Sequence, residues 1–131
     1  MEVQQISIQL ASDNPRRMLE FYRDVVQLPV VEGMGDHALQ LVPGGVLFLV
    51  DHSEVRGSNA NAARCIIDLH VGDLDAQQAR LESAGVRFLR SKGVEYWGGV
   101  ISTFEDPDGN RVQMIEFRPE LAREEDPAVA L

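Results

Sequence analysis

The chain has 131 residues, which suits one compact domain with its own core. A formal net charge of −9 disfavours nucleic acid as a partner, because phosphate binding needs clustered Lys and Arg. The hydrophobic content of 44% is ordinary for a soluble protein, and no apolar run approaches the ~20 residues of a membrane span. With no signal-peptide pattern and a single cysteine, Cys65, we expect a cytoplasmic protein without membrane contact. We interpret Cys65 as a small hydrophobic side chain that is buried or lies at an interface.

The first half of the chain begins with alternating apolar residues over 3–10, which is typical of a half-buried strand. Asn14 is a suitable N-cap and Pro15 a suitable first residue for a helix that we expect to end at Pro29. Short apolar runs at residues 30–31, 38–42 and 46–50 predict three more strands. The pair Gly44 and Gly45 predicts a hairpin between the last two.

The second half repeats this order. A strand is expected over residues 66–71, then a helix capped by Asp73 and ended by Gly85. Three further strands are expected over residues 86–89, 100–104 and 112–117. The turn before the last strand contains Asp106 and Asp108, which we interpret as turn-forming residues and not as a catalytic carboxylate pair.

Two copies of strand–helix–strand–strand–strand, spaced by roughly 60 residues, indicate an internal duplication. The predicted fold class is α+β, with two tandem βαβββ modules that form a partly open, β-barrel-like cleft. We expect one domain over residues 1–118, with modules at about 3–51 and 64–118, followed by an acidic, flexible tail over residues 119–131.

Three segments resemble signatures of the vicinal-oxygen-chelate superfamily, which contains glyoxalases, bleomycin-resistance proteins and extradiol dioxygenases. The segment LEFYRDVVQL at 19–28 resembles the first-helix signature, and VGDLD at 71–75 with AGV at 84–86 resembles the second-helix signature. The segment FEDPDGN at 104–110 closely resembles the last-hairpin signature. The three occur in the expected order, so the chain is identified as similar to this superfamily from about residue 3 to residue 117.

The resemblance implies three or four cleft-facing metal ligands in the metal-dependent members of the superfamily. The equivalent positions in this sequence are Ser7, Phe48, Ile66 and Gln113. Metal ions of that kind need imidazole nitrogen or carboxylate oxygen, which none of these residues supplies. We therefore expect no metal cofactor. Without a metal ion the chain would lack the Lewis acid on which the reactions of the metal-dependent members depend.

The leading hypothesis is a metal-independent small-molecule binding protein of the bleomycin-resistance type, which sequesters a bulky ligand and can confer antibiotic resistance. Such a site needs apolar and aromatic area with a few placed polar groups. The expected ligand-binding residues are Ser7, Gln9, Phe48, Asp68, His70, Tyr96, Trp97, Phe104 and Gln113. Trp97 can instead pack in the core or at a dimer contact, and the glycines after it suggest a flap. The resemblance also implies a homodimer.

Two alternatives remain open from the sequence. The first is a lyase-like or dioxygenase-like enzyme with a divalent metal at a displaced site around Asp68 and His70, which share one face of a strand. Asp68 can instead form a salt bridge with an arginine such as Arg64, or bind polar atoms of a ligand. The second alternative is a structural or regulatory domain with no small ligand. His37 is interpreted as a solvent-facing loop residue or a contact at the rim of the site.

Overall fold

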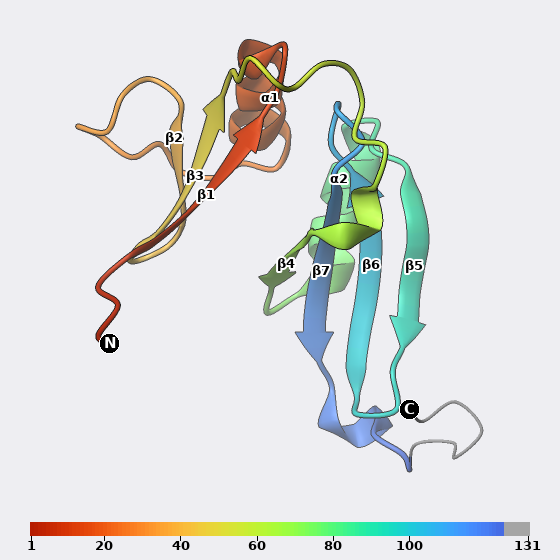
Figure 1. The fold of residues 1–131 in the computed structure, drawn as a ribbon. Coiled ribbons are helices and arrows are strands. Elements are labelled where there is room, and N and C mark those ends of the chain that lie inside the picture. The colour runs from red at the N-terminus through yellow and green to blue at the C-terminus, as the bar shows by residue number, and fades with distance from the viewer. Residues whose placement is uncertain (125–131) are drawn as a thin grey trace. The chain divides into compact units, whose positions relative to one another are not determined.

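A computed structural model describes residues 1–124 of the chain. The chain divides into two compact units, and each is described separately (Figure 1). The first unit contains residues 1–60 and 106–108, and the second contains residues 61–105 and the residues from 109 onward. Both units combine one mixed β-sheet with one helix, so the α+β fold class expected from the sequence is confirmed.

In the first unit, strands β1 (Ile6–Ala11), β2 (Ala38–Val42) and β3 (Gly45–Val50) form a sheet in the order β1-β3-β2. Strand β3 is parallel to β1 and antiparallel to β2. Gly44, at φ 79°, lies in the β2–β3 turn, as the hairpin prediction required. The strand expected at residues 30–31 is reduced to a single bridge between Val30 and Leu39.

The helix of the first unit is α1 (Pro15–Glu20), which continues as a π-helical segment over Phe21–Val25. The Asn14 side chain accepts a 3.1 Å hydrogen bond from the Arg17 amide, which confirms the predicted N-cap. The helix ends before Gln27, whose φ of 69° is left-handed, so the chain turns two residues ahead of Pro29. Buried Met18, Leu19 and Tyr22 form the apolar side of this helix.

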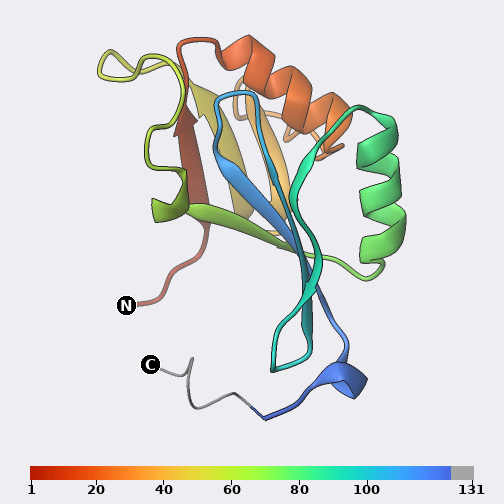
Figure 2. The same cartoon turned by 90° about the vertical axis from the view of Figure 1, so that its right-hand side faces the viewer.

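The second unit contains β4 (Ile66–His70), α2 (Leu74–Ser83), β5 (Phe88–Val94), β6 (Gly99–Glu105) and β7 (Arg111–Phe117). The sheet order is β4-β7-β6-β5, in which only the β4–β7 pair is parallel (Figure 2). Asp73 caps α2 by accepting a hydrogen bond from the Ala76 amide, and Gly85 at φ 91° follows the end of the helix. Both of these features were predicted.

Each helix covers one face of its own sheet. Helix α1 contacts β3, where Leu47 and Leu49 are buried, and α2 contacts β6 and β7. Because side chains alternate along a strand, the intervening residues point to the other side of the sheet. We call this other side the far face of each unit, defined by Ser7, Gln9 and Phe48 in the first unit and by Asp68, Thr103 and Gln113 in the second.

The turn between β6 and β7 belongs to the first unit. Asp106 accepts a 2.9 Å hydrogen bond from the Asp108 amide, which is the local turn geometry expected for these residues. The Asp106 carboxylate also accepts a 2.6 Å hydrogen bond from the Tyr22 hydroxyl, and Asp108 forms a 2.5 Å ion pair with Arg17. Both aspartates are buried, so this turn is a packed part of the first unit.

Cys65 is exposed, so its interpretation as a buried side chain is wrong for the single chain, because the apolar residues beside it alternate and only Ile67 points inward. Of the expected tail, Pro119–Leu121 forms a 3-10 turn and the Arg123 amide donates to the Tyr96 carbonyl. Residues 125–131 of that tail lie outside the described residues. No helix in residues 1–124 is long and apolar enough to cross a membrane.

Candidate functional site

The far face of the first unit places polar residues of β1 beside apolar residues of β3. Ser7 is paired with Val46, and Gln9 is paired with Phe48. Ser7 and Gln9 are exposed, whereas Phe48 is half-buried. Hydroxyl and amide groups beside an aromatic ring are the mixture that small-molecule sites use.

A pocket of about 520 Å³ opens next to Phe48 at the end of β3. Its wall includes Met34 and His37 from the loop before β2, together with Phe48. Charged side chains at this pocket are Arg16, Asp36 and Asp51. The volume lies within the range of ligand pockets, roughly 300–1,000 Å³. His37 therefore lies in the loop before β2 and contributes to the wall of this pocket.

The far face of the second unit carries a row of hydrogen bonds across three strands. The Thr103 hydroxyl on β6 donates to Oε1 of Gln113 on β7 at 3.0 Å. Nε2 of Gln113 then donates to Oδ1 of Asp68 on β4 at 2.9 Å. The two bonds fix the orientation of the Gln113 amide, because its oxygen must accept and its nitrogen must donate. We call these three residues the polar row.

The polar row joins two of the residues singled out from the sequence, Asp68 and Gln113. Within residues 1–124 Asp68 forms no ion pair, so the expected salt bridge with Arg64 is wrong. His70 lies two residues from Asp68 on β4 and is exposed at the strand end. One Asp68 oxygen is used by Gln113, and the other is available to accept a hydrogen bond from a ligand.

Phe104 does not lie on the far face. Its side chain is 0% exposed, and its ring packs edge-on against Phe88 with centroids 5.5 Å apart. It alternates with Thr103, so it points to the side of the sheet that α2 covers. The prediction that Phe104 offers aromatic area to a ligand is therefore wrong, because the ring is part of the core.

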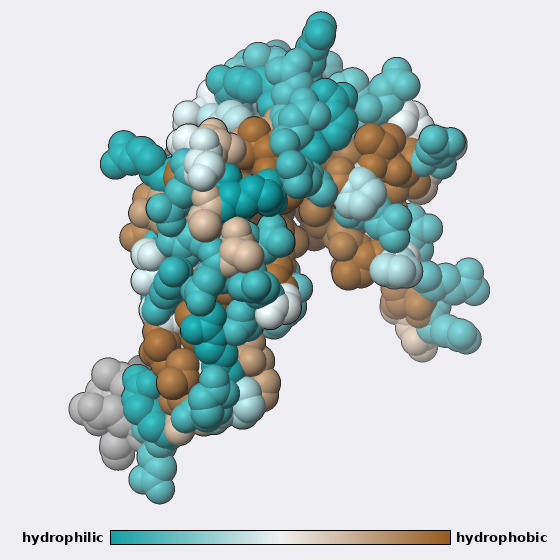
Figure 3. Space-filling model, turned by 180° about the vertical axis from the view of Figure 1, so that it is seen from behind, coloured by the Kyte–Doolittle hydropathy of each residue, from teal (hydrophilic) through white to brown (hydrophobic). Residues whose placement is uncertain are grey.

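Tyr96 and Trp97 occupy the turn between β5 and β6. The Trp97 ring stacks on Phe117 at a centroid distance of 6.4 Å and an interplanar angle of 22°. Tyr96, Trp97 and Phe117 remain 38%, 40% and 60% exposed, respectively. Hydrophobic residues are also exposed at several other places on the surface, as the brown areas in Figure 3 show. Trp97 therefore stacks on Phe117 at the surface of the single chain and is not a core residue.

The turn after Trp97 is not built as a flap. Gly98 and Gly99 are buried, and the Gly98 amide donates to the Glu95 carbonyl at 2.9 Å. The Gly98 carbonyl accepts from the Arg118 amide at 2.7 Å. These bonds hold both sides of Gly98, so its left-handed φ of 90° serves a tight turn.

The residues at the expected metal-ligand positions do not fit a metal ion. Ser7 offers a neutral hydroxyl, and Phe48 and Ile66 offer no donor atom. Both ends of the Gln113 amide are already used by Thr103 and Asp68. A displaced site around Asp68 and His70 would need a third ligand, yet residues 1–124 contain no group of three His, Cys, Asp or Glu side chains placed to hold a metal.

The comparison with protein families decides the identity of this fold. The chain matches the model described as Glyoxalase/Bleomycin resistance protein/Dioxygenase superfamily over residues 4–114. The chain belongs to this superfamily. The resemblance drawn from the sequence signatures is thereby confirmed. No curated protein sequence matches the chain.

Several solved structures are similar to the chain over most of its length. An antibiotic binding protein, TnmS3 from Streptomyces sp. CB03234, has 25% identity and a TM-score of 0.67, over 90% of this chain and 97% of that chain. A superfamily protein from Catenulispora acidiphila DSM 44928 has 22% identity and a TM-score of 0.66, over 87% and 98%. A member from Sphaerobacter thermophilus DSM 20745 has 20% identity and a TM-score of 0.65, over 86% and 95%. The last two likenesses concern the fold alone.

Sequence reasoning missed the third member of the polar row and most of the pocket wall. Thr103 lies in the apolar run of β6, and its partner becomes visible only through the β6–β7 register. Met34, Asp36 and Asp51 lie in loops, where no periodicity assigns a direction to the side chain. The hydrogen bonds of the buried Gln78, whose polar side chain interrupts the apolar face of α2, were not predicted either. That interruption was a signal, because a buried amide needs hydrogen-bond partners.

Proposed function

We propose that the chain binds and sequesters a bulky organic molecule without using a metal ion. The observation that carries this proposal is the replacement of the metal-ligand set by Ser7, Phe48, Ile66 and Gln113. The antibiotic binding protein from Streptomyces supports it, because it has the same fold at 25% identity over 97% of its own length. Antibiotic resistance through sequestration would follow from such binding.

In this proposal the far face of each unit is a candidate ligand surface, taken unit by unit. Phe48 supplies an aromatic surface beside the exposed Ser7 and Gln9. Asp68 supplies an acceptor that the Gln113 amide holds in place, and His70 lies on the same face of β4. Because the overall charge is −9 and Asp68 carries no paired cation in residues 1–124, a neutral or cationic ligand is favoured over an anionic one. We propose that the binder acts as a homodimer, which size-exclusion chromatography with light scattering would test.

The test is a thermal-shift screen of a panel of aromatic antibiotics against the full chain, followed by calorimetry on each hit. Bound ligand raises Tm, since a molecule that binds only the folded state stabilises it. Phe48→Ala should weaken a true hit by about 10-fold, because a stacking surface worth about 1 kcal/mol is lost together with buried apolar area. Asp68→Asn should weaken cationic hits by about 2- to 5-fold and leave neutral hits unchanged.

The control is Ser83→Ala, which changes an exposed hydroxyl on α2 away from both far faces. It should leave every hit unaffected. A panel in which no compound raises Tm would refute the proposal and favour a domain with no small ligand. Hits that respond equally to Phe48→Ala and Ser83→Ala would place the ligand elsewhere on the chain.

A further inference from the structure

We propose that the second unit carries a separate site for a small zwitterion of the amino-acid type, in a pocket beside the C-terminal half of α2. The pocket has a volume of about 490 Å³. Its wall is formed by Gln78 and Glu82 of α2, by Phe88 and Ser91 of β5, and by the connection that contains Arg87. It lies on the α2 side of the sheet, so it does not depend on the far-face ligand proposed above.

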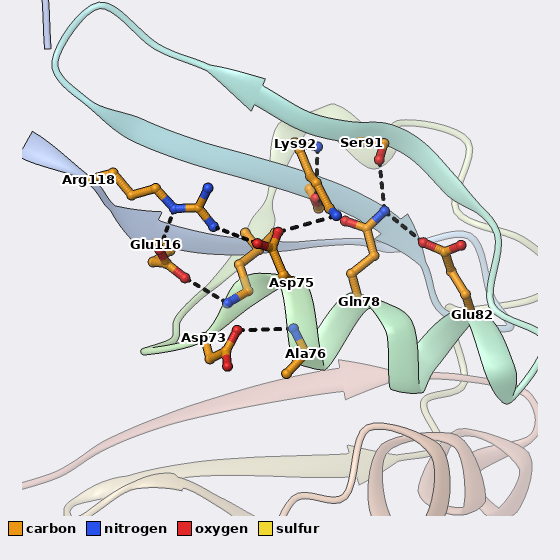
Figure 4. A network of polar contacts seen from close by, with 11 residues as sticks. Asp73, Asp75, Ala76, Gln78, Glu82, Ser91, Lys92, Glu116 and Arg118 are labelled. Carbon is orange, nitrogen blue, oxygen red and sulfur yellow. Dashed lines mark hydrogen bonds and ion pairs between the residues drawn. The ribbon is translucent and has the colours of Figure 1, made fainter. Parts of the chain in front are cut away.

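A buried hydrogen-bond network organises one wall of this pocket. The Gln78 side chain is 3% exposed, and its Oε1 accepts a 2.5 Å hydrogen bond from the Ser102 hydroxyl. Its Nε2 donates to Glu82 Oε1 and to Ser91 Oγ, both at 2.8 Å (Figure 4). Both amide hydrogens are therefore used, and Gln78 holds the Glu82 carboxylate and the Ser91 hydroxyl in fixed positions.

The network extends into the backbone of β5. The Ser102 hydroxyl accepts a 2.9 Å hydrogen bond from the Lys92 amide. Lys92 is in the left-handed region at φ 53°, at an irregularity in the β5–β6 pairing. Buried polar networks and left-handed non-glycine residues both cost free energy relative to an apolar, regular sheet. An arrangement that costs stability and ends on a pocket wall is the pattern expected of a binding site.

Three polar groups at the pocket remain available to a ligand. Ser91 accepts from Gln78, and its own hydroxyl proton has no acceptor among the described residues. Glu82 has one oxygen without a hydrogen-bond partner or ion pair in residues 1–124. Arg87 likewise has neither in the described part of the chain, although it lines the same pocket as Glu82.

These groups together select a zwitterion. A ligand ammonium group can pair with Glu82, while a ligand carboxylate can pair with Arg87 and accept from the Ser91 hydroxyl. An anion alone would face the Glu82 carboxylate, and a cation alone would face the Arg87 guanidinium. Val86 and Phe88 complete the wall with apolar area, which suits an amino acid with an apolar side chain.

The experiment is an NMR titration of the ¹⁵N-labelled full chain with three probes. L-phenylalanine carries both charges, N-acetyl-L-phenylalanine lacks the cation, and L-phenylalaninamide lacks the anion. L-phenylalanine should bind with a Kd on the order of 1 mM, as expected for a ligand of this size. It should shift the amide signals of Gly85, Phe88 and Ser91, and the other two probes should bind about 2- to 5-fold more weakly.

Charge-removing variants give a crossed pattern that a general loss of structure cannot produce. Glu82→Gln retains an oxygen for the Gln78 donor, and it should weaken L-phenylalanine and L-phenylalaninamide while N-acetyl-L-phenylalanine binds equally well or more tightly, because the repelling carboxylate is gone. Arg87→Gln should weaken L-phenylalanine and N-acetyl-L-phenylalanine and spare L-phenylalaninamide. The exposed control changes Glu105→Gln and Arg64→Gln should affect none of the three.

Absence of shifts with L-phenylalanine at tens of millimolar would overturn the inference. Shifts confined to residues outside the pocket, or equal responses of all three probes to Glu82→Gln and Arg87→Gln, would overturn it as well. None of these results bears on the far-face ligand, which the screen under Proposed function tests separately.

Discussion

The Tyr22 hydroxyl donates a 2.6 Å hydrogen bond to Oδ2 of Asp106, a residue 84 positions further along the chain. Both side chains are buried, and Oδ1 of Asp106 accepts from the Asp108 amide. Both carboxylate oxygens therefore have donors. The pair connects the first-helix signature to the last-hairpin signature, so these two distant segments are in direct contact within the first unit.

Changing Tyr22 to Phe should destabilise the chain by about 1–3 kcal/mol, because the buried Asp106 carboxylate loses the hydrogen bond from the Tyr22 hydroxyl. Chemical denaturation at pH 7 measures this loss. The matched control is Tyr96→Phe, which removes an exposed hydroxyl and should change the free energy of unfolding by less than about 0.5 kcal/mol. Equal effects of the two changes would show that the Tyr22–Asp106 bond contributes nothing.

The same pair predicts a loss of stability at alkaline pH. Burial, with a smaller contribution from the Asp106 carboxylate, raises the pKa of Tyr22 well above 10.0. A raised pKa means that the unfolded chain loses this proton first, so the stabilisation is complete below about pH 10 and declines as pH rises further. The free-energy difference between the wild type and Tyr22→Phe should shrink above about pH 10. A constant difference would contradict a protonated, buried Tyr22.

A cluster of ion pairs at the start of α2 predicts a loss of folding stability at acidic pH. The hydrogen bond from Lys92 and the nearby Arg118 lower the pKa of Asp75, and the Arg118 and Leu74 hydrogen bonds lower the pKa of Glu116 (Figure 4). Because these pKa values fall on folding, the stabilisation is present above about pH 4 and is lost as pH falls through the folded-state values. Arg118→Gln should therefore destabilise the chain at pH 7 and have little effect near pH 2. Arg64→Gln, an exposed arginine, serves as the control, and an Arg118 effect independent of pH would contradict the cluster.

Gly98 and Gly33 form a matched pair for testing the β5–β6 turn. Both have a left-handed backbone, at φ 90° and 83°, so an alanine is strained at either position. At Gly98 a Cβ atom would also lie 2.7 Å from the Arg118 carbonyl oxygen, whereas at Gly33 it meets nothing within 4 Å. Thermal unfolding should show a larger loss for Gly98→Ala than for Gly33→Ala. Equal losses would mean that the turn yields without cost, as a flap would.

The order of helices and strands could be predicted from the sequence, because caps, turn glycines and periodicity are local signals. Asn14 and Asp73 cap the helices where they were expected, and Gly44 and Gly85 have the left-handed backbone required of them. The π-helical segment after Glu20 could not be predicted, since no local signal marks it.

The candidate site was harder to predict, because it depends on register and on strand order. Asp68 and Gln113 could be grouped from the superfamily resemblance, yet their hydrogen bond and its link to Thr103 follow from the β4-β7-β6 order. Phe104 was assigned to the ligand because residues 100–104 are largely apolar and do not alternate, so the sequence could not tell which face each side chain takes. The Gln78 network arises from contacts between α2 and β6, which no local pattern contains.

The central claim is ligand binding without a metal, and the most direct test is to run the antibiotic panel twice. One run uses full-length protein treated with chelator, and the other uses the same protein after addition of Zn²⁺, Ni²⁺, Mn²⁺ or Fe²⁺. We predict that the same compounds raise Tm by the same amount in both runs, and that metal alone leaves Tm unchanged. Compounds that bind only after metal is added, or near-stoichiometric metal uptake that is lost in Asp68→Ala, would contradict the account.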